Sequence, residues 1–323
     1  MSSSQLSEAG EAAAAPRSFS YGGQAVIEGV MMRGAYSAVV AVRDPEGQIV
    51  LHEQPLNAAL YRGPISKIPF VRGLTMLWDA LGLGTRALMW SADVALGEEE
   101  DVSFNGPLGI GTLVLSLAFG IGLFFLLPAA VSSGLQSLLG LQDDALLTNI
   151  IEGLIRLALT VGYIWAIGRI GEIARLFRYH GAEHKTINAY EAGAELTPES
   201  AARFSLQHPR CGTGFILVVM VISIFVFSLL GRPAFFWLLV SRVALIPVIA
   251  GIAYEFIRFT AARMDKPWIR VLVAPSLALQ RLTTNEPDAG MLEVAIMALE
   301  RVLASEQTQV SSTTQAEVVP AGD

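Results

Sequence analysis

The chain has 323 residues, of which 53% are hydrophobic and 16% charged, and its mean hydropathy is +0.51. Because soluble globular proteins carry about 25% charged residues, this composition excludes a wholly disordered chain and favours an integral membrane protein over a soluble one. The net charge of −7 argues against a nucleic-acid partner, which usually needs a basic surface, and the single cysteine, Cys211, excludes an intrachain disulfide.

The N-terminal region predicts a tail followed by a small β structure. Residues 1–20 are rich in Ser and Ala and lack the apolar core of a signal peptide, so we expect a disordered tail. Within the segment 21–65, apolar residues alternate over 35–56 around the turn sequence at 44–47, which predicts a β-hairpin. A two-stranded hairpin is marginally stable alone, so it must pack against another element.

Residues 66–97 predict an amphipathic helix at the cytoplasmic membrane interface. A narrow polar stripe on this apolar helix consists of charged residues seven positions apart: Arg72, Asp79, Arg86 and Asp93. Such a stripe is typical of a helix that lies on the membrane surface, although a fifth span is an alternative. Gly82 and Gly84 are expected to divide the helix in two.

Four apolar segments are long enough to cross the membrane as helices, which takes about 20 residues. They are 106–131, 145–168, 213–231 and 233–254. Glu152 and Arg156 in the second segment are four residues apart, so they share a helix face and are expected to pair. Arg242 in the last segment also needs a partner, for which Glu152 or an aromatic ring suffices.

Lys and Arg residues concentrate before the first span, between the second and third, and after the fourth. Because positive residues favour the cytoplasmic side, both termini and the central segment 169–212 are predicted to be cytoplasmic. These elements predict an α-helical integral membrane protein with about four transmembrane helices and a small cytoplasmic α+β portion. Its expected partner is the lipid bilayer.

The cytoplasmic C-terminal segment, 255–306, contains a second amphipathic helix over 288–306. Its apolar side carries Met291, Leu292, Ala295, Ile296 and Leu299. This pattern predicts a helix that docks on the rest of the cytoplasmic portion. Residues 307–323 again predict a disordered tail.

The central segment gathers most of the metal-binding side chains of the chain. It holds three of the four histidines and the only cysteine, namely His180, His184, His208 and Cys211. The pattern His-x-x-Glu-His at 180–184 is that of the inverted zinc proteases, in which the histidines bind zinc and the glutamate is the general base. The pattern alone is weak, and its clustering with the other two residues favours a site for Zn²⁺ or another divalent metal over a metal-free loop.

Two arrangements of this site are open. If the three histidines and the cysteine all bind, the shell is closed and the site is structural. With three protein ligands, an open position can hold a water activated for attack, with Glu183 as the base. A carboxylate ligand would then come from Glu255, at the end of the last span, or from Glu191, unless Glu255 instead pairs with Arg258.

Four sequence motifs occur in order at 21–34, 179–189, 208–215 and 280–287. In these motifs, and over about 21–304, the chain resembles the YqhQ-like membrane proteins (domain of unknown function 1385), although Asn285 stands where Arg is expected. The resemblance implies a bacterial plasma (inner) membrane protein and a predicted metal-dependent enzyme of unknown substrate. It also marks further site candidates in the first motif: Gln24, Glu28, Met31, Met32 and Arg33. Glu28 would bind the metal or position a substrate. The alternative is that this motif only forms a tight loop under the hairpin.

Three functions follow from these patterns. The leading hypothesis is a metal-dependent hydrolase acting on a peptide or lipid-linked substrate at the cytoplasmic membrane face. The second is a non-enzymatic scaffold stapled by a structural zinc site. The third is a transporter or flippase that uses the charged residues of the spans, and four spans are few for this role unless the chain forms a homo-oligomer. Three metal ligands that face a cavity would favour the enzyme. Four metal ligands in a buried site without water would favour the scaffold.

Overall fold

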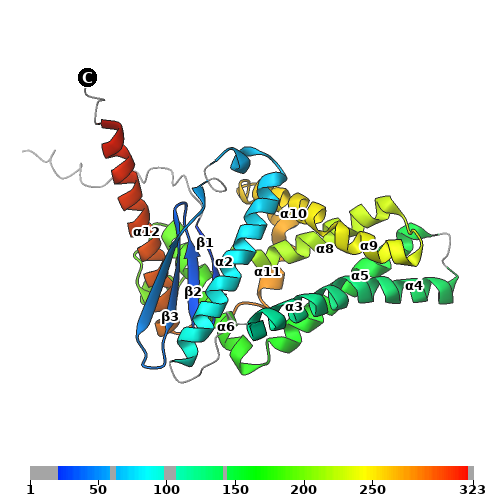
Figure 1. Cartoon of the computed structure of the whole chain (residues 1–323), viewed down its shortest axis with the longest axis horizontal. Coiled ribbons are helices and arrows are strands. Elements are labelled where there is room, and N and C mark those ends of the chain that lie inside the picture. The colour runs from blue at the N-terminus through cyan, green and yellow to red at the C-terminus, as the bar shows by residue number, and fades with distance from the viewer. Residues whose placement is uncertain (1–20, 59–62, 98–106, 141–143, 319–323) are drawn as a thin grey trace, which may run out of the picture.

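The computed structural model of the protein describes residues 21–58, 63–97, 107–140 and 144–318. A β-sheet packed between helices forms one part, and an elongated bundle of apolar helices extends from its side (Figure 1). The two parts are in contact where α2 (Val71–Leu96) packs on α10 (Ile246–Ala261), and α6 (Gly171–Glu191) and α11 (Pro267–Gln280) lie near this junction. The tail predicted at 1–20 lies outside the described residues.

The predicted hairpin is confirmed as β3 (Ser37–Arg43) and β4 (Ile49–Pro55), which pair antiparallel. Two further strands, β1 (Gly22–Val26) and β2 (Gly29–Arg33), extend it to a four-stranded antiparallel sheet in the order β1–β2–β3–β4. The sequence suggested a tight loop here because glycine disfavours strands. Pairing of β2 with β3 supplies the backbone hydrogen bonds that hold these residues extended.

Both faces of the sheet are covered by helices. On one face lie α6 and α12 (Ala289–Val318), and on the other lies α2 (Val71–Leu96). Alternate strand residues therefore enter two hydrophobic clusters, as the period of a β-strand requires. The first cluster holds Val30, Met32, Val39 and Ala41, and the second Val26, Met31, Val40 and Val42.

The amphipathic helix predicted at 288–306 is α12, and its apolar side is buried as expected. The helix continues to Val318, so residues 307–318 are helical where a disordered tail was predicted. No glycine or proline interrupts the chain between Met291 and Val318, which allows the helix to continue.

The helix predicted at 66–97 is present as α2, preceded by the 3₁₀ turn η1 (Pro64–Lys67). Gly82 and Gly84 do not divide it. Gly84 instead allows close packing, because a Cβ atom there would lie 2.3 Å from the side-chain oxygen of Gln24 on β1. Several large apolar side chains of α2 remain exposed, and 80% of the surface of Trp78 is exposed.

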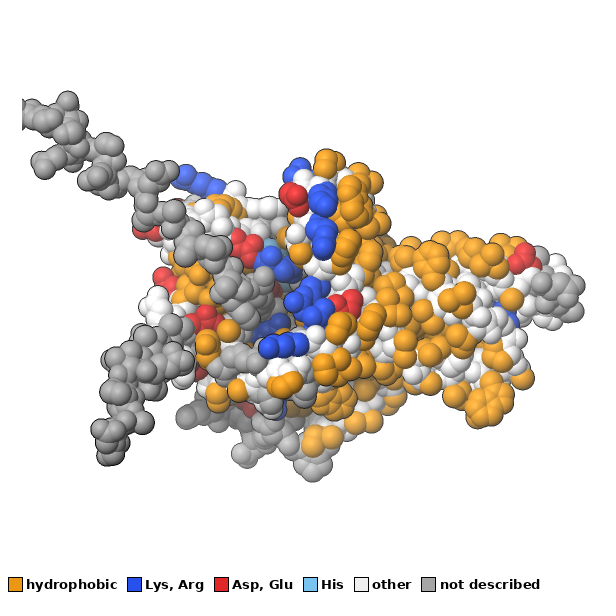
Figure 2. Space-filling view, turned by 90° about the horizontal axis from the view of Figure 1, so that it is seen from above, with side chains coloured by type: hydrophobic (Ala, Val, Ile, Leu, Met, Phe, Trp, Pro, Cys, Tyr) orange, Lys and Arg blue, Asp and Glu red, His pale blue; other side chains and the backbone are white. Residues whose placement is uncertain are grey.

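Three helical stretches are long and apolar enough to cross a membrane, and a bent pair of helices makes a fourth if it counts as one span. The first, Gly109–Leu139, runs through α3 (Pro107–Ile121), the π-helical turn η2 (Gly122–Leu126) and α4 (Leu127–Leu139). The others are α5 (Ala145–Ile167), α8 (Gly212–Leu230) and the pair α9 (Phe235–Ala244) and α10 (Ile246–Ala261), which is bent by 42°. Apolar side chains cover the visible face of this bundle (Figure 2). Of the four predicted apolar spans, three are therefore present as helical stretches of sufficient length, and the fourth is present only if the bent pair counts as one span.

A buried ionic network ties the bundle together around Glu152. Its carboxylate accepts hydrogen bonds from Arg156 at 2.8 Å, as the four-residue spacing predicted, and from Arg242 at 2.7 Å. Arg242 also lies 4.0 Å from the Phe227 ring, so both partners proposed for it are present. Arg232, after α8, adds a third guanidinium 3.2 Å from the same carboxylate. The network joins α5 to α8 and α9.

Candidate metal centre

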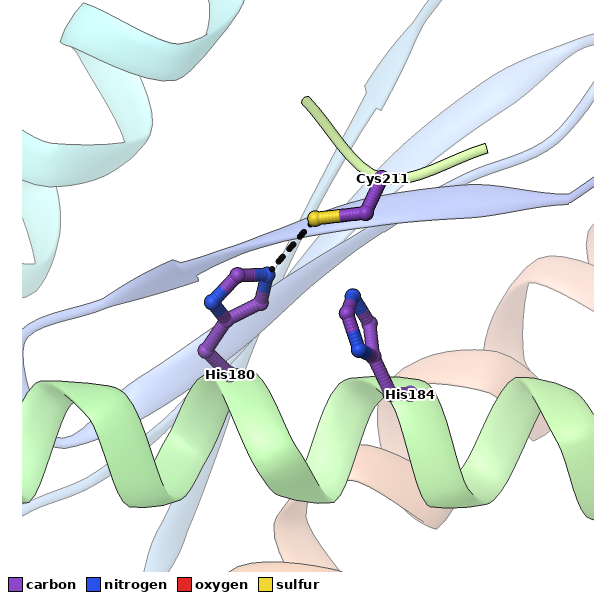
Figure 3. A group of neighbouring side chains, drawn as sticks. All are labelled: His180, His184 and Cys211. Atoms are coloured by element: carbon purple, nitrogen blue, oxygen red, sulfur yellow. Dashed lines mark hydrogen bonds between the residues drawn. The ribbon is translucent and has the colours of Figure 1, made fainter. Parts of the chain in front are cut away.

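His180 and His184 lie one turn apart on α6, and their side chains point to the same side, toward Cys211 (Figure 3). Their ring centroids are 4.4 Å apart. Cys211 precedes α8, and its Sγ lies 3.2 Å from His180 Nε2. One ligand atom of each residue lies within 4.8 Å of the other two. Two segments distant in sequence thus bring two imidazoles and a thiol to one point.

Each imidazole of this group is oriented by a backbone carbonyl. His180 Nδ1 lies 2.8 Å from the Thr283 oxygen, and His184 Nδ1 lies 2.5 Å from the Leu206 oxygen. A carbonyl only accepts hydrogen bonds, so each Nδ1 carries the proton and each Nε2 presents a lone pair. Metal-binding histidines typically have this arrangement. His184 Nε2 is buried and has no hydrogen-bond partner within the described ranges, as an atom awaiting a cation would be.

Cys211 occupies the N-cap of α8, where its sulfur accepts a hydrogen bond from the Thr213 amide at 3.4 Å. The positive end of a helix favours negative charge, and a thiolate is the form that binds metal. The loop before it is fixed by Gln280 of α11, which accepts from the His208 amide at 2.9 Å and donates to the His208 carbonyl at 2.8 Å. The position of the thiol is therefore set by backbone contacts.

Glu183 lies between the two histidines in sequence and is only 5% exposed. Burial raises the pKa of its carboxyl to about 7, against the opposing effects of His180 and of a hydrogen bond from the Gly23 amide. Its Oε2 has no hydrogen-bond partner in the part of the chain that the structure describes. A buried carboxylate oxygen without a partner fits a site that holds a water or a cation.

Gly23 of β1 makes room for this carboxylate. A Cβ atom at position 23 would lie 3.0 Å from Glu183 Cδ and 2.5 Å from the Met31 carbonyl oxygen. Under the hydrolase hypothesis stated above, we expect Gly23→Ala to displace Glu183 and to reduce turnover at least tenfold, with the zinc content unchanged, because the histidines and the thiol keep their supports. Gly22→Ala is the matched control, since nothing lies within 4 Å of its added Cβ. Equal effects of the two substitutions would contradict this role for Gly23.

His208 lies at the edge of the group rather than in it. Its ring centroid is 5.7 Å from that of His184, and its Nε2 lies 3.8 Å from a carboxylate oxygen of Glu191. Burial lowers the pKa of His208, with Arg210 acting in the same direction and Glu191 opposing. Glu191 itself forms an ion pair with Arg210. Three candidate ligands therefore converge, and His208 and Glu191 lie beside them.

The other two predicted carboxylates are bound elsewhere. Glu255 accepts hydrogen bonds from Arg72 at 2.8 and 2.5 Å and from the Phe70 amide at 3.1 Å. Glu28, in the turn between β1 and β2, forms an ion pair with Arg175 of α6 and is 3.3 Å from the Tyr179 hydroxyl. Neither belongs to the group of converging ligand atoms.

A cavity of about 500 Å³ opens beside the converging residues, among β1, α2, α6 and the start of α8. His180, Glu183, His208 and Cys211 all contribute to its wall. Of the candidates from the first motif, Gln24, Met31 and Arg33 line the cavity, whereas Met32 is buried in the core of the sheet.

Sequence reasoning missed the two carbonyls that orient the imidazoles and the supporting amide of Gln280. A backbone carbonyl carries no side-chain signal. The motif at 280–287 contains Gln280 and Thr283, so it marked the right segment without revealing its contacts.

Comparison with known proteins gives the family. The family described as "Protein of unknown function (DUF1385)" matches residues 68–305, which include the converging histidines and cysteine. "Uncharacterized protein YqhQ" of Bacillus subtilis (strain 168) is 35% identical over 308 residues, covering 90% of this chain and 96% of that protein. No solved structure matches the chain. The chain therefore belongs to the DUF1385 family of proteins of unknown function.

Proposed function

We propose that this protein is a metal-dependent membrane hydrolase in which His180, His184 and Cys211 bind Zn²⁺ and Glu183 is the general base. The observation that carries the proposal is the pair of imidazoles whose Nδ1 atoms are held by carbonyls while their Nε2 atoms converge with a thiol. Two nitrogen donors and one sulfur donor form a ligand set that zinc accepts.

An open site favours an enzyme over a structural staple. Structural zinc sites have four protein ligands, whereas catalytic ones have three and keep a position for water or substrate. Here three ligand atoms converge, and a cavity lies directly beside them. When bound, Zn²⁺ supplies Lewis-acid polarisation of a carbonyl or phosphoryl group and favours the ionisation of water.

Residues of the chain would carry out the proton transfer and hold the metal ligands in position. Glu183, with its unpartnered oxygen at the cavity wall, would accept the proton of the attacking water and pass it to the leaving group. Thr283 and Leu206 would hold the imidazoles in the binding orientation. The site lies where the sheet part meets the apolar bundle (Figure 1), so the substrate would be reached at a membrane face.

The distribution of basic residues supports a cytoplasmic location for that face. Most Lys and Arg residues lie in segments outside the apolar spans, and these segments include the sheet part and α6. Positively charged segments favour the cytoplasmic side of a membrane. We therefore propose cytoplasmic termini and a location in the plasma membrane, with the substrate at the inner leaflet.

A structural zinc site is the second candidate, because His208 lies close enough to deserve a test. Its ring is 5.7 Å from that of His184, and a side-chain rotation would bring a fourth donor nearer. In that case the metal would hold α6 against the start of α8, and no coordination position would remain open for water or substrate.

Metal analysis of the purified full-length protein tests the proposal. We expect about one Zn²⁺ per chain, and the loss of most of it in His180→Ala, His184→Ala and Cys211→Ser, because each removes one of three ligands. His52→Ala is the matched control, since His52 stacks on Trp90 away from the group. His208→Ala retains zinc if the site is open and loses it if the site is structural. A wild-type protein without bound metal would overturn the proposal.

A further inference from the structure

The first strand of the sheet has a free edge at the cavity beside the metal centre. Within the described residues, β1 pairs with β2 alone, and the opposite edge of the sheet is β4. Four consecutive residues of β1, 22–25, line the cavity, together with residues of α2 and α6 from the two sides of the sheet. β1 is also the strand nearest the apolar bundle (Figure 1). An unpaired strand edge therefore lies in the same wall as Glu183 and the candidate metal ligands.

The two edges of the sheet differ in how they are protected. Proteins usually block an exposed edge strand with a charged residue or a proline, because its free amides and carbonyls would otherwise pair with another chain. β4 has both, namely Glu53, which pairs with Arg301, and Pro55 at its end. β1 has the sequence Gly-Gly-Gln-Ala-Val, without a charge or a proline. The edge toward the cavity is therefore open to a partner that offers a backbone of its own.

Ala25 directs its amide and carbonyl toward this free edge. In an antiparallel pair, every second residue turns its backbone groups away from the neighbouring strand. Gly23 is such a residue, because its amide donates a hydrogen bond to Glu183. The pairing of β1 with β2 continues without a bulge, so Ala25, two residues later, faces the same way. No backbone hydrogen bond from the described turns, loops and caps reaches Ala25.

We propose that the cavity binds an extended segment of a polypeptide, which adds a strand beside β1 and pairs with the backbone of Ala25. This inference rests on the proposed function and names its substrate class, a peptide. A strand advances about 3.3 Å per residue, so a segment paired at Ala25 reaches Glu183, beside Gly23, within about two residues. A lipid chain has no alternating donors and acceptors and would leave these backbone groups unpaired, which disfavours the lipid alternative.

The reaction is hydrolysis of a peptide bond. The oxygen of a water forms a bond to the carbonyl carbon while the bond from that carbon to nitrogen breaks. Glu183 takes a proton from the water and delivers it to the leaving nitrogen, so that one peptide bond and one water give one carboxyl group and one amino group. Pairing with β1 holds the carbonyl carbon in place for this attack.

The remaining cavity wall indicates which peptides to use as probes. Leu83 of α2, Phe177 of α6 and Ile216 of α8 line it and are apolar. The probe is therefore a mixture of acetylated hexapeptides in which Thr alternates with Ala, Leu or Phe. It is added to the full-length Glu183→Gln variant in detergent, so that it binds without being hydrolysed. Hydrogen exchange followed by mass spectrometry should show slower exchange in the segment 21–27 and no change at the other edge, 49–55.

A second mixture with the same side chains separates strand pairing from apolar binding. In it every peptide nitrogen is methylated, which removes the hydrogen-bond donors and prevents pairing with a strand. We expect it to bind at least tenfold more weakly than the unmodified mixture, the loss expected for about two main-chain hydrogen bonds.

A change in β1 tests the same contact from the side of the protein. Ala25→Pro removes the amide at the free edge, a position where an edge strand tolerates proline, and should weaken binding of the unmodified mixture at least fivefold. Ala25→Val adds a similar volume but keeps the amide, so it should weaken binding less. Thermal unfolding of both variants identifies any that fails to fold, and the methylated peptides test the inference without either variant.

Four outcomes would overturn the inference. They are equal affinity for the two peptide mixtures, equal effects of the two substitutions at Ala25, slower exchange of 21–27 with a lipid extract instead of with peptides, and slower exchange that depends on protein concentration alone. The last would identify a second copy of the chain as the occupant. Zinc is measured on the same samples. Bound zinc without peptide binding rejects the substrate class alone, whereas peptide binding to a protein without zinc rejects the proposed function.

Discussion

Replacing Glu152 by glutamine is expected to lower the free energy of unfolding by about 3–5 kcal/mol, the cost of removing one partner from a buried ion pair. Glu152 is buried and accepts hydrogen bonds from Arg156, Arg232 and Arg242. Glutamine preserves the volume but removes the only negative charge that the described contacts give these guanidiniums. The positive charges would then remain in an apolar bundle without compensation.

The measurement is unfolding of the detergent-solubilised protein by heat or by denaturing detergent. Glu293→Gln is the control, because Glu293 forms an exposed ion pair with Arg43, and such pairs contribute about 0–1 kcal/mol. Adding Arg156→Met to Glu152→Gln should recover part of the loss, since one positive charge leaves with the negative one. Equal stability of the two single variants would show that the network is not a major source of stability.

This network also shows where sequence reasoning is strong. A spacing of four residues on a helix determines that two side chains meet, so the pair Glu152–Arg156 was predictable and is present. Arg242, placed within an apolar segment, had to find a partner, and it does. The apolar spans themselves follow from composition, because few other structures accommodate such long apolar runs.

Sequence reasoning fails where distant segments compete for the same group. Glu255 and Glu28 had the right chemistry for a metal site, but Arg72 and Arg175 bind them, and neither ion pair has a local sequence signal. Strands β1 and β2 were missed for a related reason, since their stability comes from pairing with β3 rather than from their own composition.

The candidate metal centre lies between these extremes. One helix turn explains why His180 and His184 share a face, so the sequence was sufficient for that half of the site. Convergence with Cys211 depends on where the start of α8 lies relative to α6. The choice of three converging residues over four depends on where the ring of His208 lies. Both depend on tertiary packing, which no local sequence pattern reveals.

Glu183→Gln is expected to abolish hydrolysis while leaving the zinc content unchanged. Glutamine is nearly the same size as glutamate but cannot accept a proton, and general bases contribute about 100- to 10,000-fold to rates. The assay incubates the purified protein with a bacterial lipid extract, and separately with a peptide mixture, and follows products by mass spectrometry. Products formed by the wild type should fall at least 100-fold in Glu183→Gln.

The matched control is Glu172→Gln, an exposed glutamate on the same helix α6, which should retain full activity. Zinc measured in each sample separates loss of the base from loss of the site, because Glu183 is not among the converging ligands. Undiminished turnover in Glu183→Gln with zinc present would mean that another group accepts the proton. Glu191 would then be the alternative to test, since its carboxylate lies 3.8 Å from His208 Nε2 at the edge of the same group.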